Sequence, residues 1–279
     1  MLKIKKAVFP VAGLGTRFLP VTKAMPKELL PIVDKPLIQY AAEEAVKAGI
    51  DTLIFVTGRN KRAIEDHFDN NKELEDSLRL KGKHDQANLI KNILPKGVEC
   101  IFVRQSEQLG LGHAVMCAER VIGGEPFAVL LADDFIIPHG KGPTNDLVNN
   151  FYKSGKLQLS VMKVEDSEIS KYGVLKLSKN GKSMVGLVEK PKLSDAPSNL
   201  ASIGRYVLTY EIFDVLRNLE LGQNGEIQLA DAIDILARKG KAEAVKLNGK
   251  RFDCGFRKGF IEANVEVFKQ IQINSENSK

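Results

Sequence analysis

Short apolar runs alternate with amphipathic stretches through the first half of the chain. Continuous Val, Ile, Leu and Phe residues predict four buried strands, at residues 5–13, 52–58, 98–105 and 125–135. Apolar residues at helical spacing predict helices between them, at residues 35–49, 60–68 and 112–122. Buried strands separated by helices are typical of a parallel sheet covered on both faces. The pattern therefore favours the α/β class, with Asn60 capping one helix and Gly49 ending another.

The pattern changes after about residue 156. Four predicted strands follow one another with only loops between them, at residues 157–164, 172–178, 183–191 and 201–209. Such strands predict mixed or antiparallel additions to the same sheet. Helical spacing returns at 226–240 and 259–271, and the last stretch has an apolar stripe formed by Phe260, Ala263, Val267 and Ile271. Residues 69–95 are polar and helical in character, so we expect them to form a surface excursion.

The composition suits one large domain in a reducing compartment. The chain has 279 residues, 43% of them apolar, and no apolar run of about 20 residues that predicts a membrane span. Three cysteines without CxxC spacing favour a cytoplasmic protein. The net charge of +6 fits either a lysine-rich surface or an anionic ligand. Nucleic acid is not an expected partner, because no dense basic run is interleaved with aromatic residues.

A glycine-rich loop with several cations follows the first predicted strand. The stretch GLGTRFLPVTKAMPKE contains Gly13, Gly15, Arg17 and Lys27. Glycines let backbone N–H groups approach a phosphate, and a guanidinium can bind two phosphate oxygens at once. The dinucleotide-binding pattern G-x-G-x-x-G fails at Phe18, and no Walker motif occurs in the chain. A tight strand-to-helix turn is the alternative explanation for the two glycines.

Further polar groups follow other predicted strands. Asp133 and Asp134 end the fourth strand, where ligands of open α/β sheets bind; a turn or helix cap is the alternative. Glu189 and Lys190 end a later strand, where a carboxylate suits a polyol and a lysine suits a phosphate; a surface ion pair is the alternative. Gln105 has the donor and acceptor that a uracil edge requires, although a surface amide is the commoner role.

These motifs, and their order along the chain, resemble those of the sugar-phosphate nucleotidylyltransferases. The long motif GLGTRFLPVTKAMPKELLPIVDKPLIQY is followed in order by VRQSEQLGLGHAV, LADD, KYGV, VEKP, APSNLASIGRYVL, GEIQLADAI and FDCG. The resemblance covers nearly the whole chain. It implies a Rossmann-like fold with a mixed, mostly parallel central sheet flanked by helices. It also implies one domain over residues 1–279, with a nucleotide-binding half at 1–156 and a sugar-binding half, including the C-terminal helix, at 157–279.

The resemblance also implies an activity and a set of site residues. The activity is transfer of a uridylyl group from UTP to glucose 1-phosphate, which gives UDP-glucose and pyrophosphate. Mg²⁺ is expected on Asp133 and Asp253, with Asp134 ranked below them. Catalytic roles are expected for Arg17, Lys27 and Lys190. Nucleotide contacts are expected from Ala12, Gly13, Gly15, Glu28, Gln105 and Gly110. Sugar contacts are expected from Gly173, Glu189 and Lys190, with Asn199 and Arg205 as neighbours of the sugar pocket.

Other functions stay open at this point. Within the class, the alternatives are thymidylyl or cytidylyl transfer, or use of an N-acetylhexosamine phosphate. A non-catalytic sensor of nucleotide sugars on the same fold could dispense with Asp133, Asp253 or Lys190, and all three are present. A dinucleotide-dependent oxidoreductase is disfavoured by Phe18. The resemblance further implies a homo-oligomer, either a dimer or a tetramer.

Overall fold

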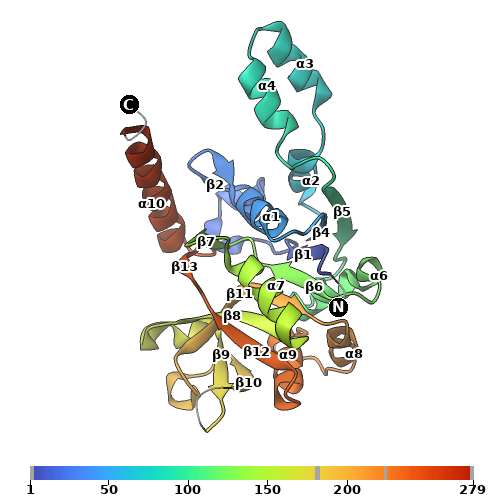
Figure 1. The fold of residues 1–279 in the computed structure, drawn as a ribbon, viewed down its shortest axis with the longest axis vertical. Coiled ribbons are helices and arrows are strands. Elements are labelled where there is room, and N and C mark those ends of the chain that lie inside the picture. Colours follow the sequence, from blue (N-terminus) through green and yellow to red (C-terminus); the bar gives the residue numbers. More distant parts are fainter. Residues whose placement is uncertain (1–2, 180–182, 223–224, 277–279) are drawn as a thin grey trace.

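A mixed sheet of nine strands forms the centre of the molecule (Figure 1). The computed structural model describes residues 3–179, 183–222 and 225–276. The strands of the central sheet are β1 (Lys6–Pro10), β4 (Thr52–Thr57), β5 (Glu99–Arg104), β6 (Phe127–Leu130), β8 (Leu157–Lys163), β9 (Gly173–Leu177), β10 (Met184–Glu189), β11 (Leu200–Leu208) and β12 (Ala242–Lys246). The predicted α/β class and mixed sheet are confirmed.

The first half of the chain builds the parallel part of the sheet. β1 lies between β4 and β6, and β5 pairs with the outer edge of β4, all in parallel register. Successive side chains of each strand enter opposite cores: Val8 faces one core, and Ala7 and Phe9 face the other. This double burial is why the strands read as continuous apolar runs in the sequence.

Helices cover both faces of the sheet. One face packs against α5 (Gly110–Cys117), α6 (Glu119–Ile122), α8 (Glu211–Arg217) and α9 (Leu229–Arg238). The other face packs against α1 (Leu37–Lys47), α2 (Arg62–Phe68) and α7 (Pro143–Ser154). The parallel strands β1, β4, β5 and β6 each end in a loop at their carboxyl ends, which is where ligands of open α/β sheets bind.

The second half of the chain extends the sheet in antiparallel fashion, as predicted. β11 pairs antiparallel with β6, β8 and β9, and β10 pairs antiparallel with β9. β12 returns parallel to β8. A separate two-stranded sheet joins β7 (Asp134–Pro138) to β13 (Gly249–Asp253), and a second small sheet joins β2 (Pro31–Ile32) to β3 (Lys35–Pro36). The β7–β13 pair carries residues from both halves of the chain to one place.

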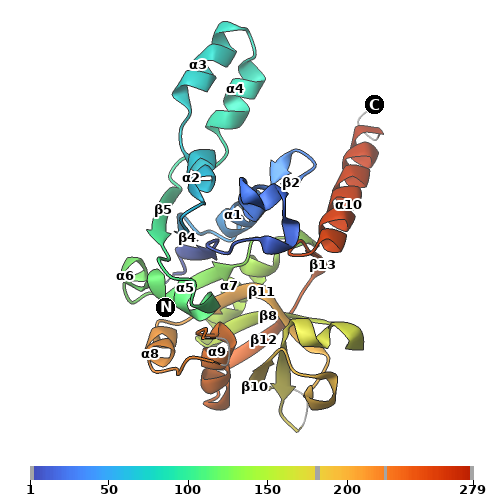
Figure 2. The ribbon, with the colours of Figure 1, turned by 180° about the vertical axis from the view of Figure 1, so that it is seen from behind.

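Two elements project from the same end of the molecule, which both opposed views show (Figures 1 and 2). One is the hairpin of α3 (Lys72–Leu80) and α4 (His84–Lys91), which forms the excursion predicted for residues 69–95. The other is the C-terminal helix α10 (Arg257–Glu276). No helix within the described part of the chain is both long and apolar enough to span a membrane.

Two local predictions are wrong. Asn60 is not a helix cap, because α2 begins at Arg62 and Lys61 takes the cap position without a side-chain capping bond. The helix predicted for residues 112–122 begins at Gly110 and is interrupted at Ala118, which separates α5 from α6. Ala114 and Val115 of the first helix and Ile122 of the second are all buried.

Candidate active site

The candidate site lies where the parallel strands end. β1 is followed by the glycine-rich loop, β5 by Gln105, and β6 by Asp133. Because the carboxyl ends of parallel strands meet at one edge of a sheet, these residues are brought together. Two cavities meet there and share Asp133 and Gly110. The smaller, of about 330 Å³, has Gln105 in its wall, and the larger, of about 570 Å³, has Lys190 in its wall.

Asp133 and Asp253 face the same point, although they lie far apart in the sequence. A Cβ atom on Gly255 would lie 3.0 Å from Asp253 Oδ1 and 3.2 Å from Asp133 Oδ2. The backbone of Cys254 donates a hydrogen bond to Asp133 O at 2.8 Å, which fixes the two segments beside each other. The β7–β13 pairing therefore gathers the two carboxylates that the sequence could not connect.

Asp253 is held by two side chains from different elements. The Tyr172 hydroxyl donates a hydrogen bond to Asp253 Oδ2 at 3.0 Å, and Arg251 lies 3.5 Å from the same oxygen. Burial raises the pKa of Asp253 above its usual value, against the opposing effect of the Arg251 charge. Arg251 also donates to the Tyr172 hydroxyl at 3.0 Å, so the three groups form one network.

Asp134 has a structural environment that differs from that of its neighbour. Its Oδ2 accepts a hydrogen bond from the backbone of Gly204 at 2.7 Å, and its Oδ1 forms an ion pair with Arg251. Both oxygens are therefore engaged by the protein, and the side chain is nearly buried. This arrangement agrees with ranking Asp134 below Asp133 as a metal ligand.

Each of the three expected catalytic cations lies in a wall of these cavities. Lys27 Nζ forms an ion pair with Asp133 Oδ2 at 2.6 Å. Burial alone would raise the pKa of Asp133, but the charge and hydrogen bond of Lys27 bring it below its usual value. The Arg17 guanidinium lies over the Phe256 ring, 4.2 Å from its centroid, and Lys190 pairs with Glu189 at 3.1 Å.

The glycines of the site differ in what a side chain at each position would meet. Gly15 adopts φ +67°, and a Cβ there would lie 3.1 Å from the Lys27 side chain. A Cβ on Gly13, in contrast, would meet open space. Gly110 adopts φ +93°, and a Cβ there would lie 2.9 Å from the carbonyl oxygen of Ile227. Gly110 is thus required first for the approach of another chain segment, a role that the sequence interpretation did not foresee.

Two of the expected nucleotide-binding side chains are buried. Gln105 is 6% exposed, and its amide nitrogen donates a hydrogen bond to the carbonyl of Gly110 at 3.2 Å. Glu28 is 2% exposed and forms an ion pair with Lys61 at 2.7 Å. Burial raises the pKa of Glu28, and Lys61 opposes the shift. The sequence analysis expected Glu28 to contact the nucleotide and did not foresee its pairing with Lys61.

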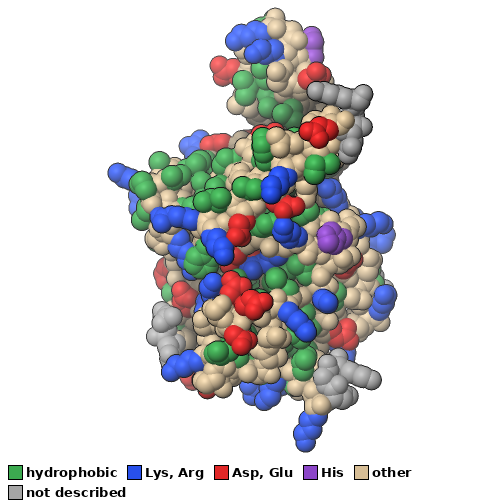
Figure 3. Space-filling model, turned by 90° about the vertical axis from the view of Figure 1, so that its left-hand side faces the viewer, with side chains coloured by type: hydrophobic (Ala, Val, Ile, Leu, Met, Phe, Trp, Pro, Cys, Tyr) green, Lys and Arg blue, Asp and Glu red, His purple; other side chains and the backbone are tan. Residues whose placement is uncertain are grey.

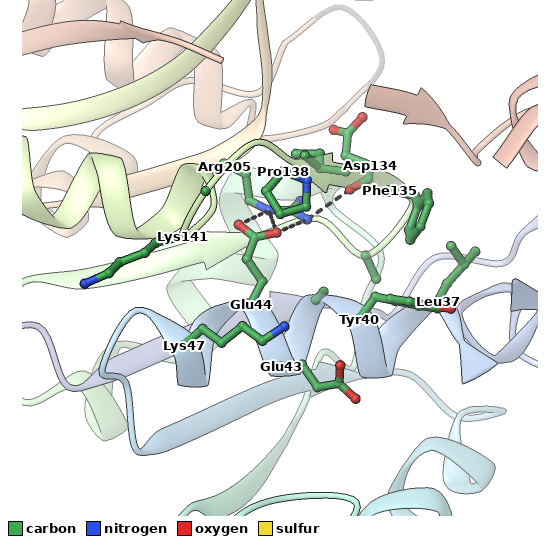
Figure 4. A pocket seen from close by; sticks show the side chains of 14 residues that line it. Leu37, Tyr40, Glu43, Glu44, Lys47, Asp134, Phe135, Pro138, Lys141 and Arg205 are labelled. Carbon is green, nitrogen blue, oxygen red and sulfur yellow. Dashed lines mark hydrogen bonds and ion pairs between the residues drawn. The ribbon is translucent and has the colours of Figure 1, made fainter. Parts of the chain in front are cut away.

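The two residues expected as neighbours of the sugar pocket, Asn199 and Arg205, do not line either site cavity. Arg205 is 2% exposed and points into a separate cavity of about 440 Å³, where it forms a bidentate ion pair with Glu44 of α1 (Figure 4). The carboxylate of Asp134 points away from Glu44 in the same view. Arg205 also donates a hydrogen bond to the backbone oxygen of Asp134 at 3.0 Å, so the two residues are neighbours. Asn199 is exposed and lies outside the walls of both site cavities.

The remaining expected residues lie around these cavities. Ala12 and Gly13 line the smaller one, and Gly173 and Glu189 line the larger one. Glu189 Oε2 would lie 3.0 Å from a Cβ on Gly173, so the missing side chain gives this carboxylate its room. Tyr172, Arg251 and Phe256 were missed, although Tyr172 lies within the KYGV motif and the other two directly flank the FDCG motif. Nothing in their spacing indicated that they would meet.

The donor set suits a small hard cation that is shared with a ligand. Asp133 and Asp253 supply carboxylate oxygens, which Mg²⁺ prefers, and this ion commonly takes its other ligands from phosphates and water. Within residues 3–179, 183–222 and 225–276, no cluster of three or more His, Cys, Asp or Glu side chains could hold a metal by itself. The two carboxylates therefore fit Mg²⁺ in the presence of a phosphorylated substrate.

Comparison with known proteins agrees with this geometry. The sequence pattern of the nucleotidyl transferase family matches residues 6–270. UTP–glucose-1-phosphate uridylyltransferase 2 of Staphylococcus saprophyticus is 50% identical over 269 residues, which cover 95% of this chain and 92% of that protein. The UTP-bound enzyme of Acinetobacter baumannii is 41% identical over 97% of this chain and 99% of that chain, with a TM-score of 0.88.

A further solved structure is UDP-glucose pyrophosphorylase complexed with UDP-glucose. It is 45% identical, covers 96% of this chain and 99% of that chain, and has a TM-score of 0.85. The chain belongs to the nucleotidyl transferase family, as the motif order indicated. The particular relatives found within that family are UTP–glucose-1-phosphate uridylyltransferases.

Proposed function

We propose that this chain transfers a uridylyl group from UTP to glucose 1-phosphate, which gives UDP-glucose and pyrophosphate (EC 2.7.7.9). Relatives whose names give this activity are 50% identical in sequence and align with 95% of this chain. The observation that carries the proposal is the convergence of Asp133 and Asp253 on one point, beside Arg17, where two cavities meet.

The two cavities suit the two substrates. The smaller one has Ala12, Gly13 and Gln105 in its walls and would take the uracil and ribose of UTP. The larger one has Gly173, Glu189 and Lys190 in its walls and would take glucose 1-phosphate. Glu189 would accept hydrogen bonds from sugar hydroxyls, and Lys190 would balance the charge of the sugar phosphate. The reacting phosphates would then meet near Asp133.

The reaction needs alignment more than proton transfer. An anionic oxygen of glucose 1-phosphate attacks the α-phosphorus of UTP, the bond from that phosphorus to the bridging oxygen breaks, and pyrophosphate leaves with the electron pair. No general base is needed, since the attacking oxygen is already ionised near neutral pH. Arg17 and Lys27 would balance the charge of the departing pyrophosphate, while Lys190 holds the attacking group in line. Mg²⁺, when bound by Asp133 and Asp253, would supply further neutralisation of phosphate charge.

We also propose that the chain forms a homo-oligomer through α10. Phe260, Ala263 and Val267 of the predicted stripe pack against the body of their own molecule. A second apolar face remains at helical spacing: Ile261 is 60% exposed, Val265 48% and Phe268 52%. Figure 3 looks onto the side that carries α10 and shows hydrophobic side chains exposed among charged ones. Such a face suits a partner copy better than solvent.

Two further assignments belong to the same proposal. A nucleotide-binding half at residues 1–156 and a sugar-binding half at 157–279 agree with most of the residues that line each cavity. The exceptions are the residues that both cavities share, together with Arg17 and Asp134, which line only the larger one. A cytoplasmic location agrees with three free cysteines in the described chain and with bacterial relatives that act on phosphorylated metabolites.

Pyrophosphate release tests the proposed function. The protein is incubated with Mg²⁺, glucose 1-phosphate and, in separate reactions, UTP, TTP, CTP, ATP or GTP. We expect release with UTP to be much faster than with the other nucleotides. Faster release with TTP would move the protein to thymidylyl transfer, and no release with any nucleotide would favour a sensor that only binds. The same assay with galactose 1-phosphate or N-acetylglucosamine 1-phosphate tests the choice of sugar.

A further inference from the structure

Ser202 presents a buried hydroxyl to the larger cavity of the site. On β11, alternate residues face this cavity, and Ser202, Gly204 and Tyr206 all line it. Ser202 is 7% exposed, and within the described part of the protein its Oγ has no hydrogen-bond partner. The mechanism outlined above gives this hydroxyl no role.

An unpartnered buried hydroxyl weakens the folded state. A hydroxyl withdrawn from water without a compensating hydrogen bond lowers stability, and native proteins keep few such groups. Burial raises the pKa of Tyr206, and the Ser202 side chain opposes this shift as a hydrogen-bonding neighbour. By distance and angle, however, Ser202 Oγ has no hydrogen-bond partner among the described residues. A polar group left in this condition at the wall of a substrate cavity is expected to find its partner on the substrate.

The sheet register places Ser202 beside the residues assigned to the sugar. Ala201 of β11 pairs antiparallel with Val174 of β9, so Ser202 stands next to Gly173. Gly173 pairs in turn with Glu189 of β10. Directly opposite residues on neighbouring strands project to the same face, so these three residues form one row across the sheet. Glu189 Oε2 leans over Gly173 within this row, on the same face as Ser202.

We propose that Ser202 is a specificity-determining residue whose hydroxyl hydrogen-bonds one hydroxyl of the hexose 1-phosphate. The inference rests on the proposed function of the larger cavity and adds a contact to it. Glu189 can only accept hydrogen bonds when ionised, whereas the serine hydroxyl can both donate and accept. Ser202 can therefore donate a hydrogen bond to a sugar hydroxyl, which the Glu189 carboxylate cannot do. A sugar that lacks this hydroxyl would leave Ser202 unpaired and would bind less well.

A coupling experiment tests the contact. Pyrophosphate release is measured for the unmodified protein and for Ser202→Ala with glucose 1-phosphate and with its 2-, 3-, 4- and 6-deoxy analogues. We expect Ser202→Ala to lower kcat/KM for glucose 1-phosphate by about 3- to 10-fold, the usual worth of one neutral hydrogen bond. For one deoxy analogue only, Ser202→Ala and the unmodified protein should have the same kcat/KM, because that analogue lacks the hydroxyl that Ser202 binds.

Stability separates this role from a structural one. Removing an unpartnered hydroxyl should leave the Tm of the ligand-free protein unchanged or raise it, whereas removing a structural hydrogen bond would lower it. Ser160→Ala is the matched control, because Ser160 is also a buried serine, on the adjacent strand β8, and it does not line the cavity. We expect Ser160→Ala to leave the ranking of the deoxy analogues unchanged.

The outcomes are distinct. If Ser202→Ala loses the same factor with every deoxy analogue as with glucose 1-phosphate, or lowers Tm while leaving kcat/KM intact, the proposed contact is wrong. If the unmodified protein releases no pyrophosphate with any sugar phosphate, the proposed function itself fails, and this is seen before any variant is compared.

Discussion

Asp133 and Asp134 show how two identical neighbouring side chains acquire different roles. Asp133 is part-exposed, lies at the junction of the two cavities, and is paired with a lysine that also borders the site. Asp134 points into a network with Arg251 and the backbone of Gly204, and both of its oxygens are used by the protein. One carboxylate is therefore available to a ligand, while the other holds β7, β11 and β13 together.

This contrast predicts opposite consequences for the two Asp→Asn substitutions. Asp134→Asn should lower the free energy of unfolding by about 3 kcal/mol, because it leaves the buried Arg251 without its main counter-charge. Asp133→Asn should cost about 1 kcal/mol or less, since Lys27 and Asp133 are both part-exposed. Urea unfolding of the two variants measures both values. Equal destabilisation by the two substitutions would contradict the assignment.

At the scale of single elements, the sequence predicted most strands and helices correctly. Strand runs of Val, Ile, Leu and Phe were reliable because double burial in a parallel sheet leaves a continuous apolar signature. The break at Ala118 and the start of α2 were missed, because they depend on tertiary contacts. Lys61, for example, turns inward to Glu28, and its spacing alone gives no sign of this.

The sequence pattern predicted the helix α10 and its apolar stripe, but not the surface against which the stripe packs. The stripe of Phe260, Ala263, Val267 and Ile271 is apolar at helical spacing, but the sequence could not tell packing within the molecule from packing on a partner. In the structure Phe260, Ala263 and Val267 pack against the body of their own molecule, whereas Ile271 is 46% exposed. This orientation of the helix also exposes a second face, formed by Ile261, Val265 and Phe268, which the sequence analysis did not single out.

The exposed face of α10 predicts the effect of charge on assembly. Val265→Asp together with Phe268→Asp should lower the molecular mass in solution to that of one chain, because a partner would have to bury two carboxylates. Light scattering after size-exclusion chromatography measures the mass. Lys258→Asp, at an exposed polar position of the same helix, is the control and should leave the mass unchanged. A single-chain mass for the unmodified protein would refute assembly through this face.

At the scale of the whole molecule, the site exists only because the two halves of the chain meet. Asp133 follows a parallel strand of the first half, and Asp253 ends a strand of the second half. The antiparallel pairing of β7 with β13 places Asp253 opposite Asp134, directly beside Asp133. Sequence spacing carries no information on such a pairing. Only the resemblance to a family joined the two carboxylates before the structure did.

The central claim is that Asp133 and Asp253 act as one unit on the reacting phosphates. A double-mutant cycle on pyrophosphate release, with UTP, glucose 1-phosphate and Mg²⁺ at saturation, tests it most directly. We predict that Asp133→Asn and Asp253→Asn each lower kcat by about 10²- to 10³-fold. The double variant should then lose little more than either single variant, because groups that act together lose their effect together. Multiplied losses, or an Asp253→Asn variant with the unmodified rate, would contradict the account.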